Sequence, residues 1–376
     1  MKIAIFTLPL RNYNYGGVLQ NYALQTFLNK NFNCEVQTID YNIFRSNEIK
    51  IKTFLQKVVY SGYWKFKNEV NKEFDAFFKN NLKLSPLMGS YQSVNQYLVK
   101  NKFDVLITGS DQVWRLDYAF GDIAKLMFLN FDGFKNPVKK VSYAASFGVD
   151  KWTYDNKTTE VKNALNNFDA ISVREDSGLE ICNKVFNVDA KNLIDPTLLL
   201  SKEEYIDQLK LNKKENSKFL YSYILDISEE KRLVLDQIKT KLNVELATTI
   251  LASELLYKAK PHNYKQFEGL KAESINEWVN SFYNSEYIIT DSFHGMVFSI
   301  IFNKPFIVIG NKERGLSRFQ SLLKKLNLED RLFYDFDQNK MYNKLTEAID
   351  YKHVNAVIER EREISKDFLD QIIKNN

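Results

Sequence analysis

A histidine beside a glycine, shortly after an Asp-Ser pair, is the pattern in this chain that best fits chemistry. Tyr287–Thr290 is predicted to be a short buried strand, and Asp291-Ser292-Phe293-His294-Gly295 follows it directly. Ligands in open α/β sheets bind where a parallel strand gives way to a helix. An imidazole at such a place can donate or accept a proton near neutral pH. His294 is therefore a candidate general acid; the alternative is a histidine that packs or caps.

Basic residues follow two other predicted strands. Arg174 comes directly after Ala170–Val173, and Lys312, Arg314 and Arg318 follow Pro305–Ile309. A guanidinium group pairs well with carboxylate or phosphate, so these residues could hold an anionic substrate. Arg174 could instead pair with the two acids that follow it, and the other three could form a solvated basic face.

A third group of polar residues lies at the end of the predicted strand Asp104–Thr108. Gly109-Ser110-Asp111-Gln112 combines a hydroxyl, a carboxylate and an amide. Asp111 could orient sugar hydroxyls or act as a base, with Ser110 and Gln112 as further contacts. The alternative for Asp111 is an N-cap of the next segment.

Two glycines directly precede the first predicted helix, Val18–Asn29. Tyr15-Gly16-Gly17 follows the strand Lys2–Thr7, and backbone amides at a helix start can hold an anion or a hydroxyl-rich ligand. The pair could also mark a tight turn. The GxGxxG spacing is absent, which disfavours dinucleotide binding and hence a nicotinamide oxidoreductase.

The elements around these residues predict a doubly wound α/β fold. Strands and helices alternate from residue 1 to about 200, Asp195-Pro196-Thr197 marks a break, and the alternation then restarts. We expect two Rossmann-like domains facing across a cleft, at 1–199 and 200–350. The helices predicted in the second domain include Ile275–Asn284 and Gly295–Phe302. A helical insertion is expected at about 50–85, and a helix at 351–376 that could pack back on the first domain.

The charge, cysteine content and hydropathy of the chain argue against several classes of protein. The chain has 376 residues, a net charge of +5 and two cysteines, Cys34 and Cys182, far apart. The mild, mixed charge gives no case for nucleic acid, and the cysteines suit a reducing compartment. No segment has the ~20 apolar residues of a membrane span, and no cluster has metal-ligand spacing. A cytoplasmic protein without a metal is expected.

Six motifs in order resemble the polysaccharide pyruvyl transferase family. The resemblance covers residues 1 to about 332 and rests on these segments: Asn14-Tyr15-Gly16-Gly17-Val18-Leu19-Gln20, Gly109-Ser110-Asp111-Gln112-Val113-Trp114, Ser142-Tyr143-Ala144-Ala145-Ser146-Phe147-Gly148, Ser172-Val173-Arg174-Glu175, Asp195-Pro196-Thr197 and Thr290-Asp291-Ser292-Phe293-His294-Gly295.

The resemblance implies a two-domain fold like that of GT-B glycosyltransferases. It also implies transfer of the enolpyruvyl carbons of phosphoenolpyruvate onto two hydroxyls of a sugar, which gives a pyruvate ketal. The first domain would hold the acceptor and the second the donor. Phosphoenolpyruvate is a co-substrate, and no cofactor is implied. The acceptor would be a surface polysaccharide or its lipid-linked precursor, which could bring the protein to the inner membrane face.

By this resemblance His294 is the general acid, and Arg174, Ser292 and the three basic residues at 312, 314 and 318 bind the donor. Asp111, with the Tyr15–Gly17 and Ser110–Gln112 segments, contacts the acceptor. The chain departs from the family in one place: Ser292-Phe293-His294 stands where better-studied members have Arg-Leu-His. Lys312, Arg314 or Arg318 could replace that arginine, or the donor binds differently.

Two other functions stay open. A nucleotide-sugar glycosyltransferase of GT-B type would have the same architecture but would need a base and ribose site, which we cannot identify in the sequence. A non-catalytic glycan-assembly protein of the same fold is the other alternative, suggested by the missing arginine. The residue pattern does not indicate an oligomeric state.

Overall fold

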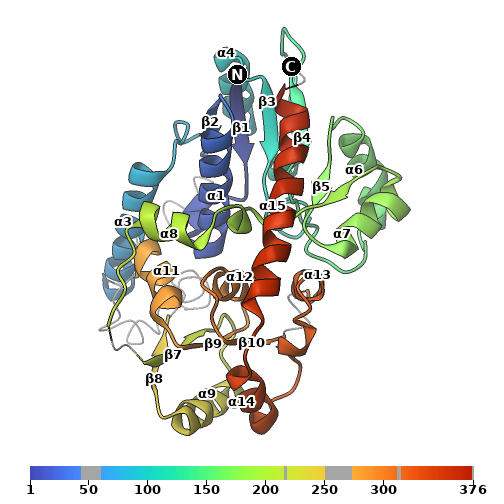
Figure 1. Ribbon diagram of the computed structural model, residues 1–376. Helices are drawn as coiled ribbons and strands as arrows, with labels where there is room; N and C mark the ends of the chain where they lie inside the picture. Colours follow the sequence, from blue (N-terminus) through green and yellow to red (C-terminus); the bar gives the residue numbers. More distant parts are fainter. Residues whose placement is uncertain (44–60, 216–217, 250–272, 311–314, 375–376) are drawn as a thin grey trace. The chain divides into compact units, whose positions relative to one another are not determined.

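The computed structural model describes residues 1–43, 61–215, 218–249, 273–310 and 315–374. The chain divides into two compact units. Unit 1 comprises Met1–Val59, Asp75–Leu199 and Arg360–Asn376; unit 2 comprises Tyr60–Phe74 and Leu200–Glu359. Each unit has its own parallel sheet and its own helices (Figure 1).

The sheet of unit 1 has the strand order β2-β1-β3-β4, and every pairing in it is parallel. A short parallel pair, β5-β6, continues it through single bridges that join Val141 to Ala170 and Ala145 to Val173. The strands are β1 (Lys2–Phe6), β2 (Glu35–Thr38), β3 (Val105–Thr108), β4 (Lys139–Ser142), β5 (Ser172–Val173) and β6 (Lys191–Asn192). All four residues of β3 are buried, as expected for a parallel strand covered on both faces.

Helices cover this sheet, and several begin at recognisable caps. They are α1 (Tyr15–Asn31), α4 (Tyr91–Asn101), α5 (Asp122–Met127), α6 (Thr158–Leu165) and α7 (Asp176–Ile181). Helix α3 (Ser61–Asn81) belongs to unit 2 up to Phe74 and to unit 1 from Asp75. Ser90 and Ser93 form a reciprocal capping box at the start of α4. Trp114 lies at the centre of the core, with its ring stacked on Phe128 at 5.7 Å and tilted against Phe147 at 5.1 Å.

The sheet of unit 2 has the order β11-β10-β9-β7-β8, again with parallel pairings. Its strands are β7 (Phe219–Tyr223), β8 (Glu245–Thr248), β9 (Tyr287–Thr290), β10 (Phe306–Ile309) and β11 (Leu332–Phe333). Its helices are α8 (Lys202–Leu209), α9 (Glu229–Leu242), α11 (Ile275–Asn284), α12 (Phe293–Ile301), α13 (Ser317–Lys325) and α14 (Gln338–Thr346). Every residue of α12 is buried, which explains its almost wholly apolar sequence.

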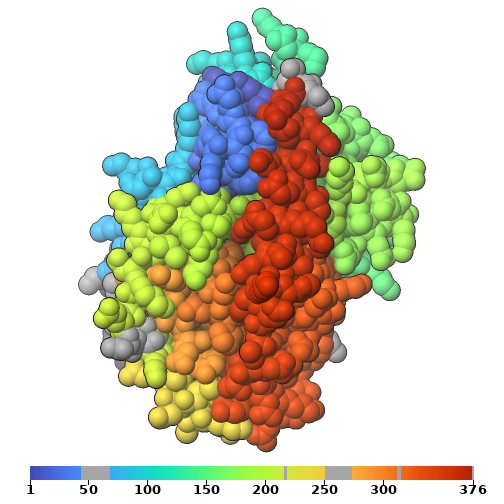
Figure 2. Space-filling model, in the orientation of Figure 1, coloured from blue at the N-terminus to red at the C-terminus, as the bar shows by residue number. Residues whose placement is uncertain are grey.

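The last helix, α15 (Tyr351–Lys374), runs along the surface. Figure 2 shows its final turns beside the segment that holds α6 and the β5-β6 pair. Within unit 1, Arg362 Nε donates to the Leu198 carbonyl at 2.6 Å, and Lys139 Nζ donates to the Ile372 carbonyl at 2.9 Å. These bonds anchor the end of the chain to unit 1.

The α/β class with two Rossmann-like, parallel-sheet units is confirmed. Helix α11 and strand β9 have the predicted bounds, and other elements differ at their ends. Two differences matter for function. Helix α1 begins at Tyr15 where Val18 was predicted, and α12 begins at Phe293 where Gly295 was predicted. Both glycine-containing motifs therefore lie inside the first turn of a helix.

Candidate functional site

The sheet of unit 1 reverses its winding direction between β1 and β3. Strand β2 lies on one side of β1 and β3 on the other, so the loops that follow β1 and β3 lead in opposite directions. Because the strands are parallel, their carboxyl ends meet at one edge. Open α/β sheets bind ligands at this reversal. The segments around Gly17 and Asp111, singled out from sequence, both lie there.

The first of these segments is the amino end of α1. Asn14 caps the helix by accepting a hydrogen bond from the Gly17 amide at 3.1 Å. Gly16 and Gly17 have helical backbone and not the positive φ of a tight turn, so the tight-turn alternative is wrong. A Cβ atom on Gly17 would lie 3.5 Å from Asp111 Oδ2. The Asp111 carboxylate thus sits at the positive end of the helix dipole, while the Tyr15 ring is buried.

Asp111 itself is held in an unusual conformation. Its φ is 78°, in the left-handed region that costs a non-glycine residue of order 1–3 kcal/mol. Asp111 Oδ1 accepts from the Gln112 amide at 2.8 Å, and the Asp111 carbonyl accepts from the Ser146 amide at 3.1 Å. The next helix, α5, begins only at Asp122 after Gly121. Asp111 is therefore not an N-cap, and surrounding bonds impose its backbone geometry.

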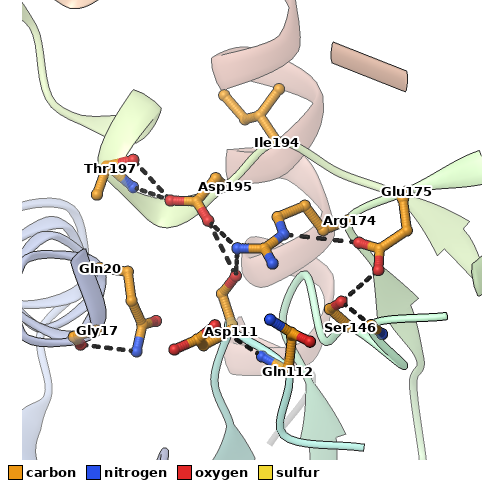
Figure 3. A network of polar contacts seen from close by, with 12 residues as sticks. Gly17, Gln20, Asp111, Gln112, Ser146, Arg174, Glu175, Ile194, Asp195 and Thr197 are labelled. Atoms are coloured by element: carbon orange, nitrogen blue, oxygen red, sulfur yellow. Dashed lines mark hydrogen bonds and ion pairs between the residues drawn. The ribbon is translucent and has the colours of Figure 1, made fainter. Parts of the chain in front are cut away.

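Arg174 lies at the centre of a buried polar network (Figure 3). Its Nη1 is 2.6 Å from Asp195 Oδ2, and its Nε is 3.6 Å from Glu175 Oε2. The side chains of all three residues are at most 2% exposed. Of the two acids that follow Arg174, Glu175 faces the guanidinium group, and Asp176 Oδ1 accepts a hydrogen bond from Asn192 Nδ2 at 2.7 Å.

Hydroxyl groups complete this network. Ser110 Oγ donates to Asp195 Oδ2 at 3.1 Å, and the Thr197 amide and hydroxyl donate to Asp195 Oδ1 at 3.0 and 2.6 Å. Ser146 Oγ donates to Glu175 Oε1. The loops that follow β3, β4, β5 and β6 are thereby tied together behind Asp111.

The charge of Arg174 is stabilised inside this network. Burial alone lowers the pKa of Arg174, but the carboxylates of Asp195, Glu175 and Asp111 outweigh burial and hold the pKa above its ordinary value. One guanidinium therefore faces two fully buried carboxylates. Removing it would leave buried negative charge without compensation.

The two neighbours of Asp111 have different surroundings. Ser110 is fully buried within the Arg174 network. The Gln112 side chain accepts from Arg115 Nη1 at 3.0 Å and packs over Gly148. Gly148 has a φ of 65°, and any Cβ there would collide with the Gln112 amide, so glycine is required.

Unit 2 repeats this arrangement at its own reversal, between β7 and β9. Asp291 follows β9, and its carboxylate accepts from the Leu225 amide at 2.6 Å and the Asp226 amide at 3.1 Å in the loop after β7. Lys231 Nζ lies 2.7 Å from Asp291 Oδ2 and donates to the Asp226 carbonyl at 2.7 Å. A buried aspartate thus joins the two loops at the reversal.

His294 lies in the first turn of α12, three residues after Asp291. Ser292 caps the helix by accepting from the Gly295 amide at 3.3 Å, and a Cβ on Gly295 would overlap the Thr290 hydroxyl. The His294 side chain is largely buried, at 8% exposure for the residue, and its ring centroid is 5.4 Å from that of Phe293. The Arg318 guanidinium lies 5.8 Å from the same Phe293 ring.

The structure therefore groups the predicted site residues by unit. In unit 1 it brings Gly17, Asp111 and Gln112 to the sheet edge, with Arg174 behind them. In unit 2 it places Ser292, His294 and Arg318 around Phe293. Lys312 and Arg314 lie outside the described residues. Helix α13 begins at Ser317, so Arg318 is in its first turn.

The pairing of Arg174 with Glu175 was one of the two interpretations drawn from the sequence, but Asp195 and Lys231 were assigned no role. Asp195 belongs to a motif that carried the family resemblance, so its spacing could have drawn attention to it. Lys231 had no such signal, because a lysine within Glu229-Glu230-Lys231-Arg232 resembles a solvated helix start.

A cavity of about 380 Å³ lies elsewhere in unit 1, where β5 and β6 begin and α15 ends. Its lining includes Asp169, Lys191 and Phe368, none of which was predicted to act in chemistry. The described part of the chain has no cluster of three or more histidine, cysteine or acidic residues able to hold a metal. Within the same part, no helix is both long and apolar enough to cross a bilayer.

The family model for polysaccharide pyruvyl transferase matches residues 14–313. No curated protein matches the chain.

Solved structures resemble the fold. UDP-GlcNAc 2-epimerase from Neisseria meningitidis, bound to UDP-GlcNAc, aligns with a TM-score of 0.54 and 11% identity over 98% of this chain and 99% of that one. UDP-GlcNAc 2-epimerase from Methanocaldococcus jannaschii, in complex with UDP-GlcNAc and UDP, aligns with a TM-score of 0.53 and 13% identity over 96% and 99%. At such identities the likeness shows a GT-B-like fold and nothing of the ligand.

Proposed function

We propose, from the premise that the chain belongs to the polysaccharide pyruvyl transferase family, that it moves the enolpyruvyl group of phosphoenolpyruvate onto a sugar. The acceptor is a surface polysaccharide or its lipid-linked precursor, and two of its hydroxyls become a pyruvate ketal. The reaction needs phosphoenolpyruvate as co-substrate and no further cofactor.

The chemistry divides into one proton transfer and two additions. A proton reaches the methylene carbon of phosphoenolpyruvate, and C2 gains oxocarbenium character. One sugar hydroxyl adds to C2, phosphate leaves, and the second hydroxyl closes the ring. The two hydroxyls release two protons: one balances the proton given to the methylene carbon, and the other leaves with phosphate. The reaction therefore calls for an acid near the donor, cations for its charges and a base near the acceptor.

His294 is proposed as the acid. The observation that carries this role is its place in the first turn of α12, at the reversal point of the second sheet. The helix start favours the anionic groups of the donor. Ser292 caps that start, and Arg318 shares the Phe293 ring with His294. We propose Ser292 and Arg318 as donor contacts, together with Lys312 and Arg314.

Asp111 is proposed as the group that orients and deprotonates an acceptor hydroxyl. What supports this is its position beside the amino end of α1, where Asp111 Oδ2 lies 3.5 Å from the place that a Cβ on Gly17 would take. Gly16, Tyr15 and Gln112 are proposed to complete the acceptor contacts. Ser110 and Arg174 lie in the buried network, so we propose that they position Asp111. A direct donor contact for Arg174 stays a prediction.

Phosphate release from phosphoenolpyruvate, measured across candidate acceptor glycans, tests the function. Replacing His294 by glutamine should lower turnover by ~10²–10⁴-fold, the usual contribution of general acid catalysis. His353→Gln is the matched control, because His353 is an exposed histidine of α15. A folded His294→Gln protein with wild-type turnover would remove the proposed acid.

A second assay tests the donor site. Arg318→Gln should raise the KM for phosphoenolpyruvate with a smaller effect on kcat, whereas Lys324→Gln, an exposed residue of the same helix, should change neither. Thermal shift with phosphoenolpyruvate against UDP- and GDP-sugars separates the proposal from a glycosyltransferase. Stabilisation by a nucleotide sugar and none by phosphoenolpyruvate would favour the latter.

A further inference from the structure

Two large aromatic side chains within one turn of unit 1 are exposed to solvent. In the segment Arg115–Phe120, which we call the aromatic turn, Tyr118 is 46% exposed and Phe120 is 58% exposed, while Ala119 between them is fully buried. Buried Ala119 anchors the turn, and the two flanking rings project outward. Single exposed apolar side chains are common on protein surfaces, so a binding role for these two rings depends on the polar groups around them.

The aromatic turn is held in place by Arg115. The Tyr118 and Ala119 amides both donate to the Arg115 carbonyl at 2.9 Å. The Arg115 guanidinium lies over the Tyr118 ring, 4.8 Å from its centroid, and its Nε pairs with Asp117 Oδ2 at 3.1 Å. The Tyr118 ring therefore has a fixed cationic neighbour on one side.

A second connection joins the aromatic turn to the loop after β4. Arg115 Nη1 donates to the Gly148 carbonyl at 3.4 Å. Burial raises the pKa of Tyr154, and a hydrogen bond with Asp117 raises it further. Tyr154 in turn packs edge to face on Trp152, with ring centroids 5.1 Å apart. The exposed rings thus rest on a framework that binding need not order.

The aromatic turn is also continuous with the candidate acceptor site. Arg115 Nη1 donates to Gln112 Oε1 at 3.0 Å, and Gln112 directly follows Asp111. One side chain therefore links the carboxylate at the sheet edge to the Tyr118 ring. A ligand that reaches Asp111 and extends past Gln112 would meet the aromatic turn next.

We propose that the aromatic turn is a subsite for a second sugar unit of the acceptor. Tyr118 and Phe120 pack against the C–H face of a pyranose, while Asp117 accepts hydrogen bonds from its hydroxyls. The acceptor is then an oligosaccharide or longer glycan whose reacting unit lies at Asp111 and whose neighbouring unit lies on the two rings. The identity of the ligand as the acceptor rests on the proposed function.

The chemistry of the surface favours a glycan. A pyranose has an apolar face of C–H groups and an equatorial edge of hydroxyls, so it needs aromatic rings beside carboxylate, amide and guanidinium groups. One connected segment provides that combination: the rings of Tyr118 and Phe120, the carboxylate of Asp117, the amide of Gln112 and the guanidinium of Arg115. A surface that binds a membrane or a second protein molecule would have a broader apolar area than these two rings provide.

Binding of glycans, measured without donor, is the experiment. Wild type, the double variant Tyr118→Ala/Phe120→Ala and the double variant Tyr118→Phe/Phe120→Tyr are applied to an array of mono- to tetrasaccharides of bacterial surface glycans. Leu87→Ala, which removes an exposed apolar side chain elsewhere in unit 1, is the control. Calorimetry then gives Kd for the best oligosaccharide and its monosaccharide component.

The alanine double variant should lower the ratio of oligosaccharide to monosaccharide affinity by roughly tenfold, as the loss of two stacking rings implies. The variant that keeps two rings should keep that ratio, as should Leu87→Ala. An unchanged ratio in the alanine variant overturns the proposal, and so does a wild-type protein that binds no glycan on the array.

The outcomes also separate this subsite from the reaction. If phosphoenolpyruvate yields no phosphate while oligosaccharide binding depends on the two rings, the proposed function fails and the subsite stands. If phosphate release proceeds and the ratio is unchanged, the subsite fails alone. Loss of self-association in light scattering, or of binding to anionic vesicles, with unaltered glycan affinity would assign the rings to a protein or lipid surface and overturn the proposal.

Discussion

Replacing Arg174 by methionine should destabilise unit 1 far more than removing a surface charge. Methionine fills much of the same volume without the guanidinium, so the variant leaves Asp195 and Glu175 buried without their shared counter-charge. The two carboxylates come from different loops at the sheet edge. Their repulsion would loosen the framework behind Asp111 as well as lower the free energy of unfolding.

The magnitude follows from the geometry. Two unit charges about 4 Å apart interact by ~4 kcal/mol at an effective dielectric constant of about 20. Deleting one partner of a buried pair costs about 3–5 kcal/mol. Asp195 keeps its hydrogen bonds from Ser110 and Thr197, which reduce the loss. We therefore expect a loss of ~3 kcal/mol, at the lower end of that range.

The loss should depend on pH in a defined direction. Buried carboxylates without a counter-charge favour protonation, so the folded variant binds more protons than the unfolded chain. Stability then falls as pH rises, because the slope follows the difference in bound protons between unfolded and folded states. The difference between wild type and Arg174→Met should therefore be smaller at pH 5.5 than at pH 8.

Urea unfolding at both pH values, followed by tryptophan fluorescence and by hydrogen exchange of peptides from β3 and β4, measures the effect. Lys184→Met is the matched control, because it removes one partner of an exposed pair in the same unit and should leave stability unchanged. Arg174→Lys retains the charge and should lose less than the methionine variant. A loss below about 1 kcal/mol for Arg174→Met, or an equal loss at both pH values, would refute the reasoning.

Three further changes test other parts of the structure. Gly295→Ala places a methyl group on the Thr290 hydroxyl and should cost ~1–3 kcal/mol in urea unfolding; wild-type stability would contradict the tight contact at the start of α12. Asp111→Asn should keep the fold, since asparagine tolerates the positive φ, but should lower turnover by ~10²-fold or more if the carboxylate is the base; undiminished phosphate release would exclude that role. Burial, followed by repulsion from two neighbouring lysines, lowers the pKa of Lys304 to about 8, so the wild-type protein should gain stability as pH rises from 8 toward the unfolded pKa of about 10.4. Lys304→Met should abolish that rise between pH 8 and 10, and a persistent rise would show that another group causes it.

Most of the fold could be predicted because its signals are local. Tyr287–Thr290 is an apolar run of strand length, and Ile275–Asn284 has helical periodicity, so both elements appear where predicted. The starts of α1 and α12 were placed too late, since a Gly-Gly pair and a His-Gly pair look like turns. Both segments are helical and follow a side-chain N-cap, Asn14 or Ser292; a Cβ on Gly295 would overlap the Thr290 hydroxyl, whereas a Cβ on Gly17 would make only ordinary contact with Asp111.

The candidate site was predicted less completely, for a reason that Arg174 illustrates. Its position after a strand allowed two interpretations, an anion-binding group or an ion-pair partner of the acids that follow it, and the structure shows the pairing with Glu175. Its partner Asp195 lies 21 residues away along the chain, and no local sequence pattern predicts the ion pair between them. Lys231 and Asp291, 60 residues apart, form a similar pair that only the pairing of β7 with β9 brings together.

The order of residues along the chain thus determined the α/β class, the division into two parallel-sheet units and the family. It also determined which polar side chains follow the carboxyl ends of the strands. Only the tertiary structure decided which of those side chains are buried in ion-pair networks and which lie at the sheet edge or in solvent, as Tyr118 and Phe120 do. The physical reason is that helix and strand signals arise between near neighbours, whereas burial and charge compensation depend on groups brought together from distant parts of the chain.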